Sequence, residues 1–203
     1  LYDVADIGAV LEQCKPVSYY QEHALDNSSE ASIILYDSGH IFGAAFVELK
    51  LEGKRLMFSG DIGNVDVPIL RDTDPVPSGL DMLVCESTYG GRMHETTEVR
   101  KVLIERLVRQ ALSRGGVLMI PSFSLERTQE LLYDLKDLID RQHSLPRVPI
   151  FLDSPLAIDA LSVYRKYPSY YDAEAAAYLR RGQDVFDFEG LVLTRTREES
   201  KRI

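Results

Sequence analysis

The sequence predicts an α/β protein in two parts, and three observations support this. Residues 1–91 contain short apolar runs and a tight turn, which are typical of a mixed or antiparallel sheet. Residues 92–203 alternate apolar runs with amphipathic stretches, the pattern of a parallel sheet with crossover helices. A loop rich in Pro and Asp, residues 68–79, lies between the two patterns. We therefore expect two domains, 1–91 and 92–203.

The first part is predicted to begin with a helix and to continue as strands. Residues 3–13 have helical periodicity. Every second residue from Ala45 to Leu51 is apolar, which indicates a half-buried strand. Glu52-Gly53 is then the turn of a hairpin. The strands are expected at residues 17–20, 32–36, 45–51, 54–58 and 82–85, the last of them buried.

The second part is predicted to alternate helices and strands. The helix at residues 97–113 has one apolar stripe and stops at Gly115-Gly116. The stripe consists of Val99, Leu103, Leu107 and Ala111. Further helices are expected at residues 124–141, 156–167 and 172–182, and strands at residues 117–120 and 148–152. The apolar stripe of the helix at residues 124–141 is predicted to be Leu125, Leu132, Leu135 and Ile139.

Composition excludes several classes of protein. The formal net charge of −9 argues against a general nucleic-acid coat, although an acidic cleft that holds cations is compatible with it. No apolar run approaches the roughly 18 residues of a membrane span, and no signal peptide is recognisable. Cys14 and Cys85 lack metal-site spacing and are expected to be small core residues. We expect a reduced, cytoplasmic setting.

Three polar residues follow predicted strands. His40, Asp61 and Glu86 come after residues 36, 58 and 85, in segments that contain glycine. Each one also has an ordinary structural explanation. His40 could be a structural histidine with its hydrogen bonds satisfied, Asp61 could cap a turn, and Glu86 could cap the loop that follows it. Strand ends, however, are where sheets present functional groups, and neighbouring strands would bring the three together. Jointly they favour a site over three separate turns.

Six ordered motifs carry a family resemblance. They are DSGHIFGAA, FSGDIGN, CESTYGGRMHE, IPSFSLERTQELL, LDSPLA and EESKRI. In this order they resemble the RNA-processing branch of the metallo-β-lactamase superfamily, which carries the β-CASP insertion. The resemblance implies part of a metallo-β-lactamase αββα sandwich, followed by part of a parallel-sheet β-CASP domain. The ESTYG form is more similar to the polyadenylation-type endonucleases of this branch than to RNase J.

The resemblance also implies a chemistry. His40 and Asp61 match metal ligands of a two-zinc centre, with Asp61 bridging both ions, and Glu86 matches an acid that orients a proton-donating histidine. Two zinc ions can supply a hydroxide nucleophile and neutralise phosphate oxygens. Arg127 and His94 are candidates for contact with the substrate.

The chain departs from the family pattern in its histidines. The HxHxDH motif and the later family histidines are absent, and His23, His94 and His143 have no HxH or HxxxH spacing. A lone His–Asp pair is short of the three or four ligands that zinc takes. We therefore expect an internal piece of a longer enzyme, catalytically inactive alone. Its exposed sheet edges would favour a homo-oligomer.

Arg127 allows two interpretations. Ser124 is the predicted N-cap of the helix at residues 124–141, which places Arg127 in the first turn. An arginine at a helix N-terminus can bind phosphate. Alternatively, it forms an ion pair with a carboxylate such as Asp153.

The leading hypothesis is a zinc-dependent phosphodiester hydrolase that acts on RNA, either as an endonuclease or as a 5′-exonuclease. One alternative is a lactamase-fold hydrolase of small esters or thioesters, which would not need the large α/β segment from residue 92. Another is a scaffold relative without catalytic activity, which the presence of His40, Asp61 and Glu86 disfavours. No membrane partner is expected.

Overall fold

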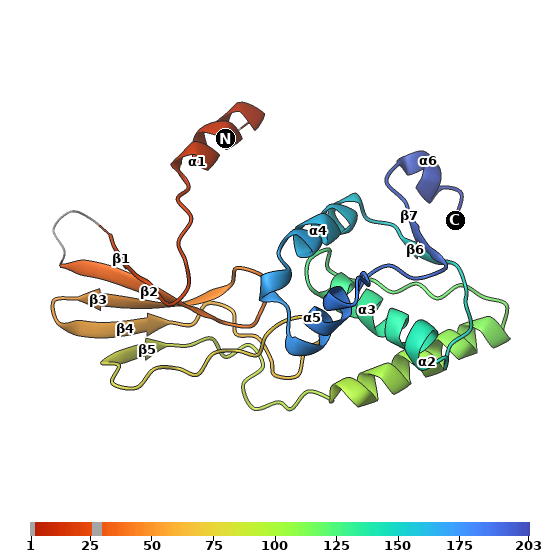
Figure 1. The fold of residues 1–203 in the computed structure, drawn as a ribbon, viewed down its shortest axis with the longest axis horizontal. Coiled ribbons are helices and arrows are strands. Elements are labelled where there is room, and N and C mark those ends of the chain that lie inside the picture. The colour runs from red at the N-terminus through yellow and green to blue at the C-terminus, as the bar shows by residue number, and fades with distance from the viewer. Residues whose placement is uncertain (1–2, 26–29) are drawn as a thin grey trace. The chain divides into compact units, whose positions relative to one another are not determined.

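The computed structural model describes residues 3–25 and 30–203 (Figure 1). The fold is α/β, as predicted, and divides into two compact units. The first unit takes its described residues from Leu1–Ser38, Ala44–Asp61 and Asp74–Glu86. The second consists of Gly39–Gly43, Ile62–Thr73 and Ser87–Ile203. Neither unit is continuous in sequence, because two loops between strands of the first unit belong to the second.

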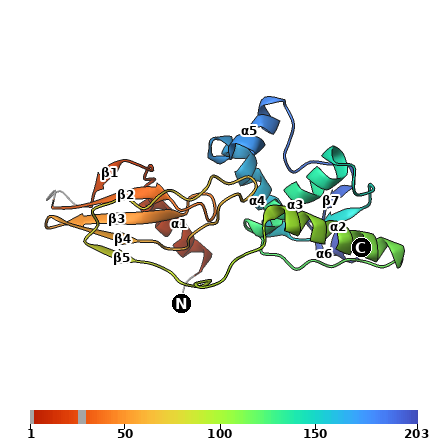
Figure 2. The same ribbon diagram turned by 90° about the horizontal axis from the view of Figure 1, so that it is seen from below.

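The first unit is built on a five-stranded sheet (Figure 2). Strands β1 to β4 pair antiparallel in chain order, and β5 pairs parallel with β4. The predicted hairpin is confirmed, since Leu51 pairs with Lys54 around a turn at Glu52-Gly53 in which both residues have positive φ. The strands are β1 (Glu22–Ala24), β2 (Ala31–Asp37), β3 (Ala45–Leu51), β4 (Lys54–Phe58) and β5 (Met82–Val84).

Two strand predictions in this unit are wrong in part. Residues 17–20 form no strand, because the chain turns at Tyr19-Tyr20, and β1 starts only at Glu22. Residues 82–84 do form a strand, but all three are exposed rather than buried. The reason is its position, since β5 is the edge strand of the sheet.

One face of this sheet is apolar from strand to strand. The register places Leu35, Val47, Phe58 and Val84 in a row across β2, β3, β4 and β5. The alternation predicted for β3 is present, but the two buried residues of β3, Phe46 and Glu48, lie on the opposite face. The apolar face is partly open in this unit, with Phe58 40% and Val84 48% exposed.

The opposite face buries a charge. Glu48 is 0% exposed, and its carboxylate accepts hydrogen bonds from Arg55 Nε at 2.7 Å and from the Tyr36 hydroxyl at 2.9 Å. The Arg55 hydrogen bond holds the pKa of Glu48 below its ordinary value, against the effect of burial. The folded sheet therefore favours the ionised form of Glu48.

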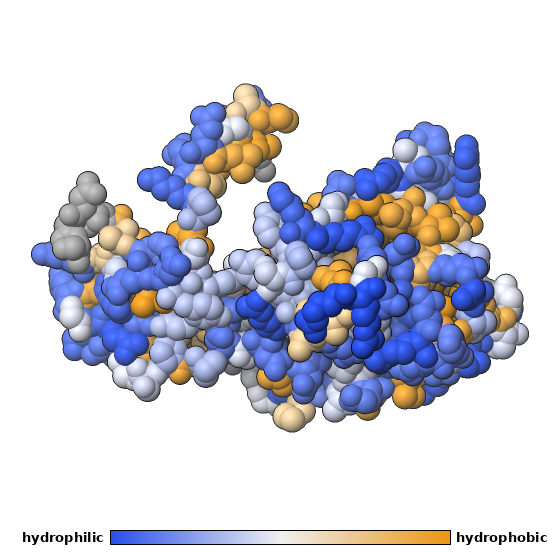
Figure 3. Space-filling model, in the orientation of Figure 1, coloured by the Kyte–Doolittle hydropathy of each residue, from blue (hydrophilic) through white to orange (hydrophobic). Residues whose placement is uncertain are grey.

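Helix α1 (Val4–Gln13) confirms the helix predicted at residues 3–13. Its N-cap Asp3 accepts a hydrogen bond from Ala5 N and forms a capping box with Asp6. None of its residues is buried, and apolar side chains lie exposed on its surface (Figure 3). Cys14, which follows it, and Cys85 are both exposed, so their prediction as core residues is wrong. Both follow elements that have no buried residues.

The second unit packs helices around a short parallel sheet. Strands β6 (Ile150–Leu152) and β7 (Leu191–Leu193) pair in parallel. Residues 117–120 form no strand and pair with none, and Val117 is 82% exposed. The helices are α2 (Thr97–Ser113), α3 (Arg127–Lys136), α4 (Pro155–Lys166), α5 (Ala173–Arg180) and α6 (Arg197–Ser200). The π-helix η1 (Asp137–Arg141) extends α3, and η2 (Pro168–Tyr170) is a 3-10 turn.

The predicted helices are present, but the predicted buried face is wrong for one helix and partly wrong for another. Helices α2, α4 and α5 lie where they were predicted. In the helix predicted at residues 124–141, Leu132, Leu135 and Ile139 are buried. In contrast, no residue of α2 is buried, and Val99 and Leu103 of its predicted stripe are half exposed. Leu125, predicted for the buried face of the third helix, precedes α3 and is exposed.

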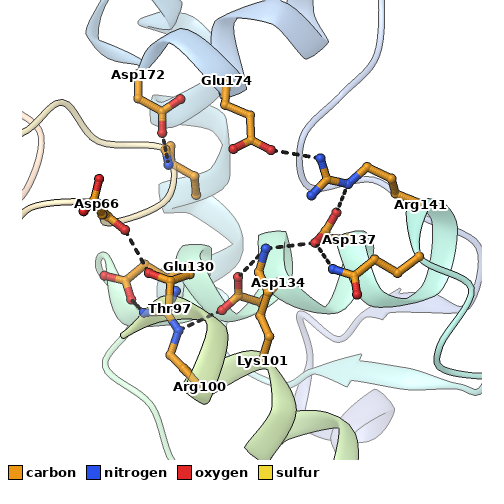
Figure 4. Close-up of polar contacts among 12 residues, drawn as sticks. Asp66, Thr97, Arg100, Lys101, Glu130, Asp134, Asp137, Arg141, Asp172 and Glu174 are labelled. Carbon is orange, nitrogen blue, oxygen red and sulfur yellow. Dashed lines mark hydrogen bonds and ion pairs between the residues drawn. The ribbon is translucent and has the colours of Figure 1, made fainter. Parts of the chain in front are cut away.

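Helix α2 meets α3 through charges (Figure 4). Arg100 Nε lies 2.8 Å from Asp134, and its Nη1 lies 2.8 Å from Glu130. Lys101 Nζ lies 2.8 Å from Asp137. The three carboxylates of α3 and η1 are buried, so the face of α2 that carries these cations turns toward them. Ile104 and Val108 of α2 also pack against the core. The packed face of α2 is therefore the one that carries these residues and the two cations, not the predicted stripe.

The buried carboxylates make Arg100 essential for stability. Arg100→Met removes one cation from both Glu130 and Asp134, which keep only Arg127 at 2.9 Å and Lys101 at 3.8 Å. We expect the loss of these charged hydrogen bonds to lower the free energy of unfolding by about 1.5–3 kcal/mol. Arg106→Met, on the exposed side of the same helix, should change it by less than about 0.5 kcal/mol. Urea unfolding measures both variants. Equal effects would contradict the proposed ionic packing.

The lowered pKa of Glu48 predicts a pH dependence. Its ionised form stabilises the fold, so the contribution is present above the ordinary pKa of 4.5 and is lost as the pH falls through the folded-state pKa. Glu48→Gln should therefore lose less unfolding free energy than the unmodified chain when the pH falls below 4.5. Glu52→Gln, in the exposed turn of the same hairpin, controls for net charge. Parallel pH curves for the Glu48→Gln variant and the unmodified chain would contradict the assignment.

Candidate functional site

The parallel pair β4–β5 brings two predicted site segments to one end of the sheet. Asp61 follows β4 by three residues, and Glu86 follows β5 by two. Ser59 joins them, because its N–H donates to the Val84 carbonyl at 2.9 Å and its hydroxyl accepts from Glu86 N–H at 3.0 Å. The backbone at Glu86 is thereby fixed to the loop that leads into Asp61.

His40 lies in the second unit, on the loop Gly39–Gly43. Gly63 approaches this loop so closely that a Cβ there would lie 1.9 Å from the Gly39 carbonyl oxygen and 2.6 Å from His40 N. Gly39 has φ +64, and a Cβ on it would lie 2.7 Å from Thr73 N. Only glycine fits at these two positions. The loop that carries His40 is therefore held against the segment Ile62–Thr73.

These residues fit zinc by chemical type. A neutral imidazole and a carboxylate are both ordinary zinc ligands. Within residues 3–25 and 30–203, however, no group of three or more His, Cys, Asp or Glu side chains is arranged to hold a metal ion. The described residues therefore offer fewer donors than a zinc centre needs, and the assignment of His40 and Asp61 as ligands stays a prediction.

Arg127 begins α3, but the predicted N-cap is wrong. The N-cap is Glu126, while the Ser124 hydroxyl lies 3.2 Å from the hydroxyl of Ser154, the N-cap of α4. The helix starts later because residues 125–127 form a tight turn before it. Arg127 Nη1 pairs with Glu130 at 2.9 Å, on its own helix, and no contact with Asp153 is found among the described residues. The Arg127 side chain is 65% exposed.

Glu126 is a strained and buried residue that the sequence did not reveal. Its φ of 67° and ψ of −68° form a γ-turn, closed by Arg127 N–H donating to the Leu125 carbonyl at 2.9 Å. Such a conformation costs a non-glycine residue about 1–3 kcal/mol. Burial raises the pKa of its carboxyl to about 8. The fold therefore favours the protonated carboxyl, and ionising it costs stability as the pH rises from 4.5 to about 8.

A polar cluster lies at the carboxyl ends of β6 and β7. Asp153 and Thr194 directly follow these parallel strands, and the Thr194 hydroxyl donates to the Asp153 carboxylate at 2.9 Å. The hydroxyl of Ser200, from α6, donates to the same carboxylate at 2.7 Å. The LDSPLA and EESKRI motifs, about 40 residues apart in the sequence, are thus in contact. The carboxyl ends of parallel strands are a usual place for ligand sites in α/β proteins.

His94 lies on the surface of the second unit. Its ring makes an edge contact with the Tyr89 ring at 4.7 Å between centroids, and the side chain is exposed. Sequence reasoning missed Ser59 and Thr194, which are ordinary small polar residues until the strand pairing is known. It missed Glu126 because a positive φ is signalled in a sequence by glycine, which is absent here.

Comparisons with known proteins agree with the motifs. The family model described as Beta-Casp domain matches residues 128–203. The chain is 36% identical over 200 residues to Ribonuclease TTHA0252 of Thermus thermophilus, which covers 98% of this chain and 44% of the relative. It is 31% identical over 167 residues to Cleavage and polyadenylation specificity factor 73 of Drosophila melanogaster, covering 82% of this chain and 24% of the relative.

An archaeal relative extends the comparison. The RNase J-like protein of Methanocaldococcus jannaschii is 32% identical over 169 residues, which cover 82% of this chain and 39% of the relative. The chain spans less than half the length of each of these relatives. The Beta-Casp match lies in the second unit, where the LDSPLA and EESKRI motifs meet. Residues 128–203 therefore carry a Beta-Casp domain, and along 98% of its length the chain is similar to a ribonuclease.

Proposed function

We propose that the protein to which this chain belongs hydrolyses phosphodiester bonds in RNA with two zinc ions. The observation that carries this proposal is the parallel β4–β5 pairing, which brings the segments of Asp61 and Glu86 to one end of the sheet. The names of the relatives, among them Ribonuclease TTHA0252 and Endoribonuclease YSH1 of Yarrowia lipolytica, support RNA as the substrate.

In this proposal the zinc ions, when bound, supply a hydroxide nucleophile and neutralise phosphate charge. His40 and Asp61 are two of the ligands, and other residues of the intact protein complete the set. Glu86 acts by position, because its backbone is fixed through Ser59 and its carboxylate can orient a proton-donating histidine. The chain alone is inactive for lack of ligands.

The N-termini of α3 and α4 are proposed to bind the phosphate backbone. The hydroxyls of Ser124 and Ser154 are in contact there, and Arg127 lies at the first position of α3 with its side chain largely exposed. Backbone N–H groups at helix N-termini, together with an arginine, are suited to phosphate oxygens. Glu130 orients Arg127 and leaves most of its surface to solvent.

Hydrolysis of small esters or thioesters by the same fold is the competing function. Both functions would use His40 and Asp61, so the substrate separates them. Cleavage of a uniformly labelled RNA but not of a thioester by the intact protein supports the proposal, and the reverse result contradicts it. Cleavage of a circular RNA identifies an endonuclease, because a 5′-exonuclease has no end from which to start.

Asp61→Asn tests the assignment directly. In the intact protein this variant should lower the rate of RNA cleavage at least about a hundredfold, because a neutral amide would bind zinc more weakly than the carboxylate. Its melting temperature should stay within a few degrees of that of the unmodified protein, because Asp61 lies in a loop after β4.

The matched control is Asp66→Asn. Asp66 is an exposed residue five positions downstream, and its φ of 55° is one that asparagine accepts. This variant should keep full activity. Retained cleavage in the Asp61→Asn variant would mean that Asp61 is not a metal ligand.

A further inference from the structure

The loop Gly39–Gly43 is anchored at its far side by an aromatic residue. Phe42 stacks on the ring of Tyr164 in α4, with 4.3 Å between centroids and 24° between ring planes. Tyr170 and Tyr171 make further ring contacts with Phe42 at 5.8 and 5.7 Å. Phe42 packs against the buried core of the second unit. The loop is therefore clamped by Gly63 at its start and by Phe42 near its end.

Tyr164 is itself fixed by the strained residue. Tyr164 is 4% exposed, and its hydroxyl donates a short hydrogen bond of 2.5 Å to Glu126 Oε2. Among the described residues, Glu126 is the hydrogen-bond partner of the Tyr164 hydroxyl. Glu126 lies at the centre of the γ-turn before α3 and is 7% exposed, so its carboxyl group meets the Tyr164 hydroxyl inside the unit. The backbone strain is offset by this buried contact.

We propose that the contacts Glu126–Tyr164–Phe42 hold the loop Gly39–Gly43 in place, so that Glu126 and Tyr164 are positioning residues for His40. All four residues belong to the second unit. The consequence for catalysis rests on the proposed function, in which His40 is a metal ligand, but the ordering of the loop does not. Residues behind a ligand commonly set its orientation.

Amide hydrogen exchange at residues 39–43 of the metal-free chain tests this. Tyr164→Phe removes the hydroxyl and keeps the ring, while Phe42→Leu removes the stack and keeps an apolar side chain. Each should speed exchange at residues 39–43 by about tenfold, with unchanged exchange in the β2–β3 pairing. Tyr133→Phe is the matched control, because Tyr133 is a buried tyrosine of α3 whose ring contacts the ring of Tyr178. It should leave exchange at residues 39–43 unchanged.

A second pair of variants examines the hydrogen bond itself. Glu126→Ala removes the acceptor and should speed exchange like Tyr164→Phe. Glu126→Gln keeps an acceptor of the same length and should restore slow exchange. Exchange at residues 39–43 that matches the control in both Tyr164→Phe and Phe42→Leu would overturn the proposal, as would a Glu126→Gln variant that exchanges as fast as Glu126→Ala.

The experiment has separate controls for a loss of folding and for a failure of the proposed function. If Tyr164→Phe or Glu126→Ala loses its cooperative thermal transition, Phe42→Leu decides alone, because Phe42 is only partly buried. In the intact protein, Phe42→Leu should also weaken zinc binding by about tenfold or more. An intact protein that binds no zinc would refute the proposed function, while the exchange rates at residues 39–43 would still decide the positioning role.

Discussion

The proposed site depends above all on the parallel pairing of β4 with β5. Every other neighbouring pair in this sheet is antiparallel, and an antiparallel β5 would carry Glu86 to the opposite end from Asp61. The pairing therefore decides whether these two carboxylates can share a site. Ser59 adds a hydrogen bond on each side, to Val84 and to Glu86, and so fixes the loops beyond the strand ends. Catalytic groups on such short, fixed segments need little reorganisation.

The second unit is shaped by carboxylates that must be buried with partners. Glu130, Asp134 and Asp137 lie under α2, and a buried charge without a cation is strongly destabilising. Arg100 and Lys101 meet this requirement, which sets the rotation of α2 (Figure 4). The same unit holds Glu126, whose raised pKa follows from burial. Its structure thus reflects the pairing of polar groups as much as the packing of apolar ones.

The sequence was informative where a local pattern has one structural solution. The β3–β4 hairpin, α2, α4 and α5 follow from alternation, helical periodicity and terminating glycines. It misled where an apolar run needs a partner, as at residues 117–120, or where burial depends on position in the sheet, as for β5 and Cys85. Of the candidate site, Asp61 and Glu86 were predicted to lie at neighbouring strand ends, and they do. The γ-turn at Glu126 could not be predicted, because no local residue pattern specifies it.

Zinc stoichiometry tests the central claim, that this chain contributes part but not all of a dinuclear site. Elemental analysis after zinc loading and dialysis should find about two zinc ions per intact protein and less than one per isolated 203-residue chain. The Asp61→Asn form of the intact protein should retain fewer than two. Two firmly bound zinc ions in the isolated chain would contradict the account, because its own residues would then complete the site. An intact protein without zinc would contradict it as well.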